Sequence, residues 1–274
     1  MIPLRAFCVL ILLIGLCVLD VGRAAAQADR APRVRRTLTL DQGQLRIDAA
    51  LFMDRIEVTV LDATVSEQFL WLTGGAGFGV TPDAEVGALP LALLLSPDFE
   101  LGNPVLYGQY RFLRGNTELG ARLDLSIPLR KGSHTVLTAG VPVLAHLGST
   151  ATLDTGLFLE THFASETLLN LRLPLEAVVR PKPDGFFVGG RLALVLIDMD
   201  PELLTVPVGL LAGYGLPGPT TVDLVGFFEF TELFSPGASE AFSVSAWVVG
   251  LAGRIYLSPS SASSSAAEPE PAAG

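Results

Sequence analysis

Hydrophobic and polar residues alternate along several segments of the chain. In residues 118–129 every second side chain is apolar, and Arg122 and Asp124 lie between the apolar positions. Residues 169–177 repeat this pattern, with Arg172 among the intervening polar residues. Because successive side chains of a strand point to opposite faces, the pattern predicts strands with one apolar face and one charged face.

Twelve segments fit this template, most of them long enough to cross a bilayer as tilted strands, which takes about 9 to 11 residues each. They are residues 43–61 (expected to bend), 69–80, 84–95, 105–113, 117–129, 135–146, 151–163, 168–179, 186–197, 203–214, 220–231 and 242–257. Short connections rich in turn formers separate many of them, such as 81–83, 114–116 and 148–150. Prolines and glycines within the uncharged stretches 135–153 and 203–222 disfavour membrane helices.

The pattern therefore predicts an all-β fold, an antiparallel up-and-down transmembrane β-barrel of about 12 strands over residues 42–257. The predicted lipid face includes Leu119, Leu123, Leu125, Leu171, Leu173 and Leu175, and the predicted lumenal face includes Arg122, Asp124, Arg172 and Glu176. The alternative is a secreted or periplasmic β-sandwich that buries its apolar faces inside.

The two ends of the chain differ in composition from the rest. Residues 1–26 have one early charge, an apolar run and a final triplet of alanines, which predicts a cleaved signal peptide and export to the bacterial outer membrane, the periplasm or the exterior. Cleavage there removes both cysteines, Cys8 and Cys17. Residues 27–41 are predicted to be a flexible basic segment, and residues 258–274, rich in Ser, Ala and Pro, a disordered tail.

Composition narrows the classes of function. Of the 274 residues, 50% are hydrophobic and 17% charged, which excludes an intrinsically disordered protein. The formal net charge of -10 leaves no basic face to neutralise phosphates, so nucleic acid is not an expected partner.

A glycine-rich hairpin carries a family resemblance. Residues 74–79 alternate glycine with other residues and are followed by the turn 81–83, Glu85 and Gly87. This segment resembles the hairpin of outer-membrane barrels of the phenol-degradation meta-pathway transporter-like family, and a looser likeness extends over residues 37–257. The resemblance implies a barrel that passes small compounds, with hydrophobic ones among the candidates, and it supplies no catalytic residues.

Acidic residues recur at the same place after successive turns. Glu85, Glu118 and Asp154 each precede a glycine by two positions, and Asp223 sits comparably after the turn 217–219. By period two these four acids are expected to face the lumen at one level, as an acidic collar that favours cations. The alternative is that each acid caps its turn or pairs with a lumenal arginine. The candidate arginines are Arg111, Arg122, Arg172 and Arg191.

The sequence gives little support for catalysis. Its three histidines, His134, His146 and His162, lack the HxH or HExxH spacing of zinc enzymes. Strand pairing is expected to bring His134 near His162 with Glu160 on the same face, which makes either a weak metal site or ordinary polar residues of the lumen. We therefore predict no enzyme, no cofactor and no resident metal. The aromatic residues Trp71, Tyr107, Tyr110, Tyr214, Trp247 and Tyr256 are expected in the wall or at the membrane interface.

The resulting functional hypothesis is a narrow outer-membrane channel or transporter for small compounds, with hydrophobic compounds among the candidates. A barrel of 12 strands lies between the eight-stranded barrels that side chains fill and the roughly 16-stranded barrels that hold an aqueous channel, so a closed structural barrel is the alternative. The expected partners are outer-membrane lipid, the barrel-assembly machinery and small solutes.

Overall fold

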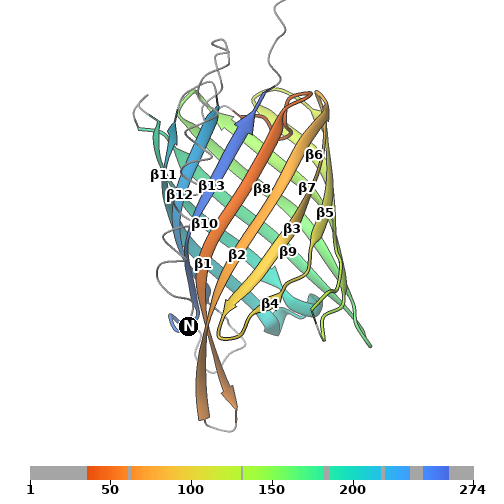
Figure 1. Cartoon of the computed structure of the whole chain (residues 1–274), viewed down its shortest axis with the longest axis vertical. Helices are drawn as coiled ribbons and strands as arrows, with labels where there is room; N and C mark the ends of the chain where they lie inside the picture. Colours follow the sequence, from red (N-terminus) through yellow and green to blue (C-terminus); the bar gives the residue numbers. More distant parts are fainter. Residues whose placement is uncertain are drawn as a thin grey trace, which may run out of the picture.

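The protein forms a cylinder of antiparallel strands (Figure 1). The computed structural model describes residues 36–60, 63–130, 132–181, 185–216, 220–234 and 243–258. The strands are β1 (Leu45–Val60), β2 (Ala63–Thr81), β3 (Ala84–Ser96), β4 (Glu100–Leu101), β5 (Val105–Leu113), β6 (Thr117–Ser126), β7 (Thr135–Leu147), β8 (Ala151–Phe163), β9 (Thr167–Val179), β10 (Phe186–Leu196), β11 (Leu204–Leu216), β12 (Thr221–Phe234) and β13 (Trp247–Leu257). Two short 3-10 helices, η2 (Ile197–Met199) and η3 (Pro201–Leu203), lie between β10 and β11.

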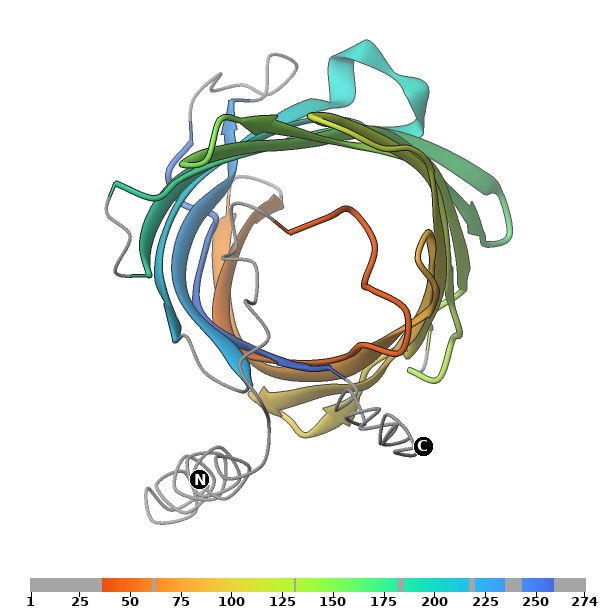
Figure 2. The ribbon, with the colours of Figure 1, turned by 90° about the horizontal axis from the view of Figure 1, so that it is seen from above.

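Pairing between the first and last long strands closes the sheet. β1 pairs with β13 from Leu45↔Leu257 to Arg55↔Trp247, and with β2 along its other edge. β4 is only two residues long and pairs with β3, so twelve long strands form the wall among the described residues. Seen along its axis the wall is a ring (Figure 2). The predicted twelve-stranded barrel is confirmed, and closure leaves no long edge unpaired in the wall.

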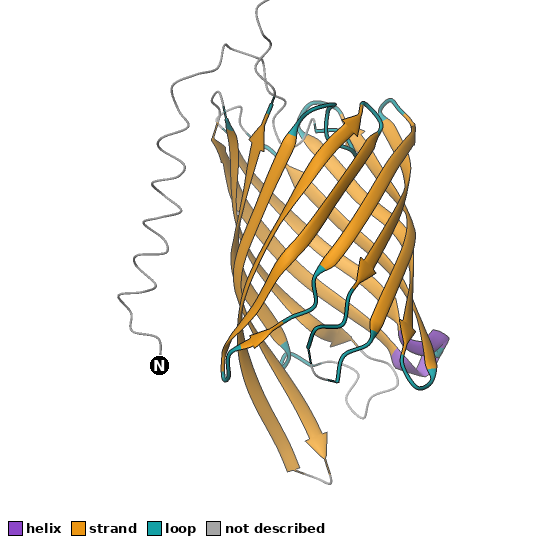
Figure 3. Cartoon of the chain, turned by 45° about the vertical axis from the view of Figure 1, so that its right-hand side comes forward, coloured by secondary structure: helices purple, strands orange, loops and turns teal. Residues whose placement is uncertain are grey.

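The strand bounds follow the sequence pattern, with a notable exception in β2. β1 is one continuous strand, paired on both sides as far as Arg55. β2 begins at Ala63, six residues before the predicted start at residue 69. The ends of β1 and β2 therefore pair only with each other and project beyond the ring as a two-stranded ribbon (Figures 1 and 3).

Three of the five prolines within the predicted strands lie where the ladder is interrupted or has ended. Pro90 falls in the register shift of the β2–β3 pairing, and Pro207 falls in the shift between Val206 and Val208. Pro128 lies beyond the end of β6. At a bulge the missing N–H of proline removes no ladder hydrogen bond, which reconciles these residues with a barrel.

The outer surface is apolar. Large hydrophobic side chains of β6 and β9 are exposed there, including Leu123 at 51% and Leu173 at 40%. The rings of Phe228, Phe230 and Trp247 pack together on the same outer face, where aromatic residues mark the membrane interface in barrels. Among the described residues, no helix is long and apolar enough to cross a membrane.

The two ends of the cylinder differ in their connections (Figure 3). The end with the tight connections at 82–83, 114–116 and 148–150 is here called the short-turn mouth, and the end with the segments 97–104, 127–134 and 197–203 the loop mouth. The predicted signal peptide (1–26), residues 27–35 of the basic segment and the tail beyond residue 258 lie outside the described residues.

Candidate functional site

A segment of the chain ahead of β1 lies inside the barrel. Residues 36–44, here called the lumenal strap, run across the ring near the short-turn mouth before they enter β1 (Figure 2). The strap forms no helix or strand, so its backbone polar groups need partners elsewhere. Thr39 and Leu40 are nevertheless buried, with 2% and 5% of their surfaces exposed. The lumen wall must therefore supply the partners.

Two of the predicted acidic residues hold the strap by its backbone. The Leu40 N–H donates to Oε2 of Glu85 at 3.0 Å, and the Leu38 N–H donates to Oε2 of Glu118 at 2.8 Å. Nε2 of Gln109 donates to the Leu38 carbonyl at 2.6 Å. Because hydrogen bonds to ionised groups are the strong ones, these carboxylates fix the path of the strap in the lumen.

A third predicted acid anchors the strap from the opposite wall. Asp223 on β12 has no exposed surface and accepts hydrogen bonds from both terminal nitrogens of Arg36, the second at 3.0 Å. The Arg36 guanidinium also lies over the Tyr256 ring, 3.9 Å from its centroid. In the order of strands around the ring, β12 stands six places from β6, which carries Glu118. The anchors thus lie on opposite sides of a twelve-stranded cylinder.

Each buried carboxylate has further partners in the wall. The Tyr107 hydroxyl donates to Oε1 of Glu85 at 2.7 Å, and Nη2 of Arg46 lies 3.2 Å from the same oxygen. Nη1 of Arg111 lies 3.0 Å from Oε2 of Glu118. A buried charge is tolerated when it is paired and hydrogen-bonded, and both carboxylates meet that condition.

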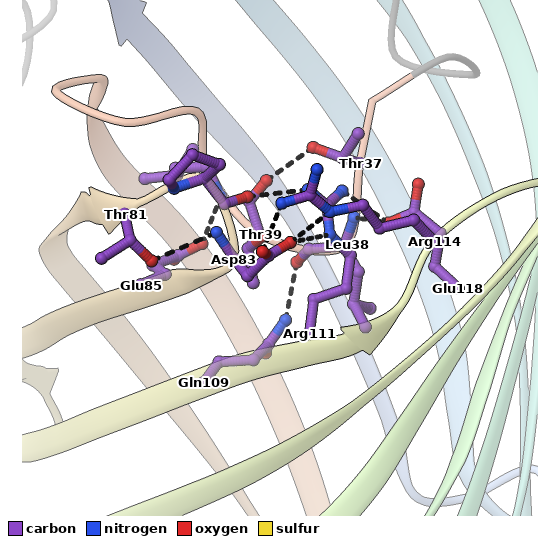
Figure 4. A network of polar contacts seen from close by, with 12 residues as sticks. Thr37, Leu38, Thr39, Thr81, Asp83, Glu85, Gln109, Arg111, Arg114 and Glu118 are labelled. Atoms are coloured by element: carbon purple, nitrogen blue, oxygen red, sulfur yellow. Dashed lines mark hydrogen bonds and ion pairs between the residues drawn. The ribbon is translucent and has the colours of Figure 1, made fainter.

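The network continues to the rim of the short-turn mouth, as Figure 4 shows. Arg111 on β5 also contacts Asp83 in the turn between β2 and β3, with Nε 3.2 Å from Oδ1. Arg114, in the next turn, donates to both oxygens of Asp83. The Arg114 guanidinium lowers the pKa of Asp83, and Arg111 contributes to the same shift. Two neighbouring turns are therefore joined through one carboxylate.

Asp154 differs from the other three predicted acids. It lies on β8, opposite Glu176 of β9 in register, and its side chain is exposed to the lumen. It lines the cavity described below together with Arg122 and Glu176. The four acids face one lumen, but three of them bind the strap and Asp154 lines the cavity.

The predicted lumenal arginines occupy different environments. Arg111 pairs with Glu118, as described above, and Arg191 pairs with Glu176 at 2.7 Å. Arg122 pairs with Asp124 at 2.9 Å and lies over the Tyr107 ring. The Arg172 side chain is 53% exposed, and its closest carboxylate oxygen, on Glu160, is 4.0 Å away. Opposite charges on the same strand or on neighbouring strands thus line the wall in pairs.

Two glycines make room for this arrangement. A Cβ on Gly120 would lie 2.9 Å from Cδ2 of Leu38, so a larger residue would push against the strap. A Cβ on Gly87 would overlap the ring of Tyr107, which donates to Glu85. Each glycine therefore leaves space for the residue that hydrogen-bonds the carboxylate two positions earlier: Leu38 in the case of Glu118, and Tyr107 in the case of Glu85.

A cavity of about 570 Å³ lies against the strap. Its lining includes apolar side chains of β7 to β9, among them Leu144, Phe158 and Val178. Charged residues also line it, among them Asp154 and Glu176 on the same strands and Arg46 and Arg254 on β1 and β13. A cavity lined by both apolar and charged side chains can hold a small compound that carries both kinds of group.

The predicted histidine pair forms, but it does not make a metal centre. His134 Nε2 lies 3.0 Å from His162 Nδ1, and Glu160 Oε2 lies 3.9 Å from His162 Nε2. Within the described ranges, no group of three or more His, Cys, Asp and Glu residues could hold a metal ion. The third histidine, His146, lies 3.4 Å from Glu118 at the other mouth.

Comparisons with known proteins identify the architecture. Neither a family model nor a curated protein matches the chain. The COG4313 outer-membrane channel from Pseudomonas putida F1 is similar, with a TM-score of 0.54 and 12% identity over 85% of this chain and 100% of that chain. The fold is that of an outer-membrane β-barrel. The translocator domain of the autotransporter NalP from Neisseria meningitidis (TM-score 0.46, 9% identity, 80% and 89% covered) and the CymD monoaromatic hydrocarbon channel (0.40, 9%, 79% and 88%) also match.

Several residues of the site were not found by sequence reasoning. The strap falls in a segment expected to be a flexible leader, although the repeat Thr37-Leu38-Thr39-Leu40 shows a local alternation. Tyr107 on β5 and Tyr256 on β13 are wall residues whose side chains contact Glu85 and Arg36 inside the lumen. These partners are more than 20 residues away in sequence, so local pattern carries no signal for them.

Proposed function

We propose that the protein is a bacterial outer-membrane channel that passes small, partly hydrophobic compounds through a lumen narrowed by the strap. The observation that supports this most directly is the cavity lined by both apolar and charged side chains, bounded by the strap near one mouth of a closed barrel. A water-filled porin would have no reason to present Leu144 and Phe158 to its passage. The fold likeness to the COG4313 channel agrees with this function.

The same proposal covers location, partners and family. An outer face rich in exposed leucine requires lipid around it, and short turns at one mouth and longer loops at the other match the periplasmic and extracellular ends of outer-membrane barrels. We propose outer-membrane lipid and the barrel-assembly machinery as partners, and membership of the phenol-degradation meta-pathway transporter-like group. The lumen is proposed to bind and pass solutes without catalysis or a cofactor.

Channel recordings test the proposal and the role of the strap together. Wild-type protein in a planar bilayer should show small conductance steps, and deletion of residues 36–41 should enlarge them because the strap leaves the short-turn mouth. The substitution Leu123→Val, on the lipid face, is the matched control and should leave the conductance unchanged.

Folding is checked in the same samples by the shift in gel migration on heating. If folded wild-type and strap-deleted proteins are both silent, and neither admits a small aromatic compound into proteoliposomes, the channel proposal is wrong. The closed structural barrel would then be the better description.

A further inference from the structure

A chain of hydrogen bonds runs along the loop mouth, far from the strap. His134 Nε2 lies 3.0 Å from His162 Nδ1, and His162 Nε2 lies 3.0 Å from Nδ2 of Asn170. The Asp198 backbone N–H donates to Oδ1 of Asn170 at 3.0 Å. These four residues, here called the rim brace, come from β8, β9 and the segments that precede β7 and follow β10.

The backbone N–H of Asp198 determines which atom donates and which accepts in every hydrogen bond of the rim brace. A backbone N–H can only donate, so the Asn170 atom that faces Asp198 is the carbonyl oxygen and its amide nitrogen faces His162. That amide donates to His162 Nε2, which must therefore be unprotonated. The His162 proton then lies on Nδ1 and is donated to an unprotonated Nε2 of His134. The complete chain requires both imidazoles to be neutral.

The ring geometry favours this hydrogen bond over a metal ion. The two ring centroids are 5.3 Å apart and the facing nitrogens 3.0 Å apart, a difference close to twice the radius of an imidazole ring. The rings therefore meet end-on, with each nitrogen directed at the other. A shared metal ion needs about 2.0 to 2.1 Å to each nitrogen and cannot fit on that line.

The rim brace crosses neighbouring strands that their backbone ladders also join, and it adds side-chain links between the connections at their ends. Beside His134, Ser133 Oγ donates to Oδ1 of Asn103, and the Leu129 and Arg130 N–H groups donate to the same oxygen at 3.0 and 3.1 Å. Continuous contacts thus run from the β4–β5 connection, through 127–134, to the β10–β11 connection.

The far end of the rim brace is a strained turn. Asp198 and Met199 have φ values of 51° and 56°, a left-handed conformation that costs free energy for residues other than glycine. The Asp198 side chain also accepts from the Leu169 N–H, at 3.5 Å. The hydrogen bonds of Asp198 with Asn170 and Leu169 therefore stabilise the strained turn. The turn can relax when these hydrogen bonds are lost.

Charged groups lie around the histidine pair on several elements. Glu160 on β8 lies 3.9 Å from His162 Nε2, and Arg172 on β9 lies 4.0 Å from Glu160. From the other side, Arg130 is paired with Glu100 at 2.6 Å. Asp198 adds a negative charge at the far end of the brace.

We propose that the rim brace is a proton-sensitive latch that holds the connections of the loop mouth together at neutral pH and releases them in acid. A proton on His162 Nε2 faces the N–H of Asn170, and a proton on His134 Nε2 faces the N–H of His162. Either event turns one acceptor of the chain into a donor and breaks it. The latch concerns the loop mouth and does not depend on which solute the lumen passes.

Amide hydrogen exchange of the whole folded protein in lipid nanodiscs tests the latch. Protection factors, corrected for intrinsic exchange at each pH, are compared at pH 7.5 and 5.5 for the peptides that carry residues 129–130 and 198. With histidines that titrate near pH 6.5 when free, one proton coupled to opening lowers protection about tenfold over this range, and two lower it about a hundredfold. The double substitution His134→Gln and His162→Gln should abolish this dependence on pH.

Two further variants keep the test decisive. Asn170→Asp replaces the amide donor with an acceptor for a protonated His162, so protection at pH 5.5 should rise above that of wild type. Glu166→Gln removes an exposed acid of the same mouth outside the brace and should behave as wild type. Equal protection of wild type at both pH values, or a loss in acid that survives both the double substitution and Asn170→Asp, would overturn the proposal.

Discussion

Carboxylates around the short-turn mouth differ in what surrounds them, and this determines what each can do. Glu85, Glu118 and Asp223 are buried and bind groups of the strap or the wall. Asp154 is exposed and lines the cavity. A buried carboxylate enclosed by the strap and the wall contributes little field to a passing ion, whereas a carboxylate at the surface of the cavity contributes more.

Cation preference should therefore depend mainly on Asp154. Replacement of Asp154 by Asn removes one charge from the cavity and should shift the reversal potential in a salt gradient away from cations, with a smaller effect at high salt. Glu118→Gln serves as the comparison, because it changes a carboxylate that pairs with Arg111. An equal or larger shift for Glu118→Gln would show that the collar acts as one unit. The acidic collar remains a prediction until these potentials are measured.

Acid should weaken the link between neighbouring turns at the same mouth. Because the pKa of Asp83 is lowered in the folded protein, its contribution to stability is complete above the ordinary aspartate value, near 4, and is lost as the pH falls through the lower folded value. Exchange of amides in the turns 82–83 and 114–116 should rise below about pH 4 in wild type. Asp83→Asn should show the raised exchange already at pH 7, and an unchanged pattern in that variant would contradict the role of this pair.

At the scale of single residues, the acidic residues of the site were predictable from the sequence, but the strap that they bind was not. The recurrence of an acid two positions before a glycine is a local pattern, and strand periodicity was enough to point those side chains into the lumen. The partner of Glu118 is the Leu38 N–H, 80 residues away, and the partner of Asp223 is Arg36, 187 residues away. Contacts of such separation depend on how the sheet closes, which no local spacing encodes.

At the scale of the element, each strand has a lipid face and a lumenal face with different tolerance for charge. Leu173 is 40% exposed on the outer face of β9. Leu173→Arg should destabilise the barrel in lipid vesicles by about 2 to 4 kcal/mol if that position lies near the midplane. Thr138→Arg, which points into the lumen between Asp124 and Glu160 in register, is the matched control and should cost much less. Equal losses in denaturant titrations would mean that the faces are wrongly assigned.

Strand positions were predictable because alternation and turn chemistry agree along most of the wall. The exceptions have physical causes. β4 is too short to show a period, and the β1–β2 ribbon extends beyond the ring because its two strands pair with each other past Arg55. The helices η2 and η3 follow β10 in a turn that Asn170 supports from another strand.

At the scale of the molecule, the exposed leucines predict how the protein fractionates. The folded chain should be recovered with outer membranes, need detergent for extraction, and migrate faster on gels before heating than after, because a closed sheet resists unfolding in detergent. Recovery of folded protein from a periplasmic extract without detergent would contradict this prediction and favour a secreted protein.

Attachment of the strap to opposite walls also bears on the mechanics of the cylinder. A closed sheet can flatten into an ellipse without loss of a backbone hydrogen bond, because neighbouring strands turn about their shared ladder. The strap links Asp223 on one wall to Glu118 on the facing wall through Arg36 and Leu38. This link limits elongation of the cross-section along that diameter, and so limits its compression at right angles. In a membrane under lateral pressure, the segment that occupies the lumen therefore also keeps the cross-section round.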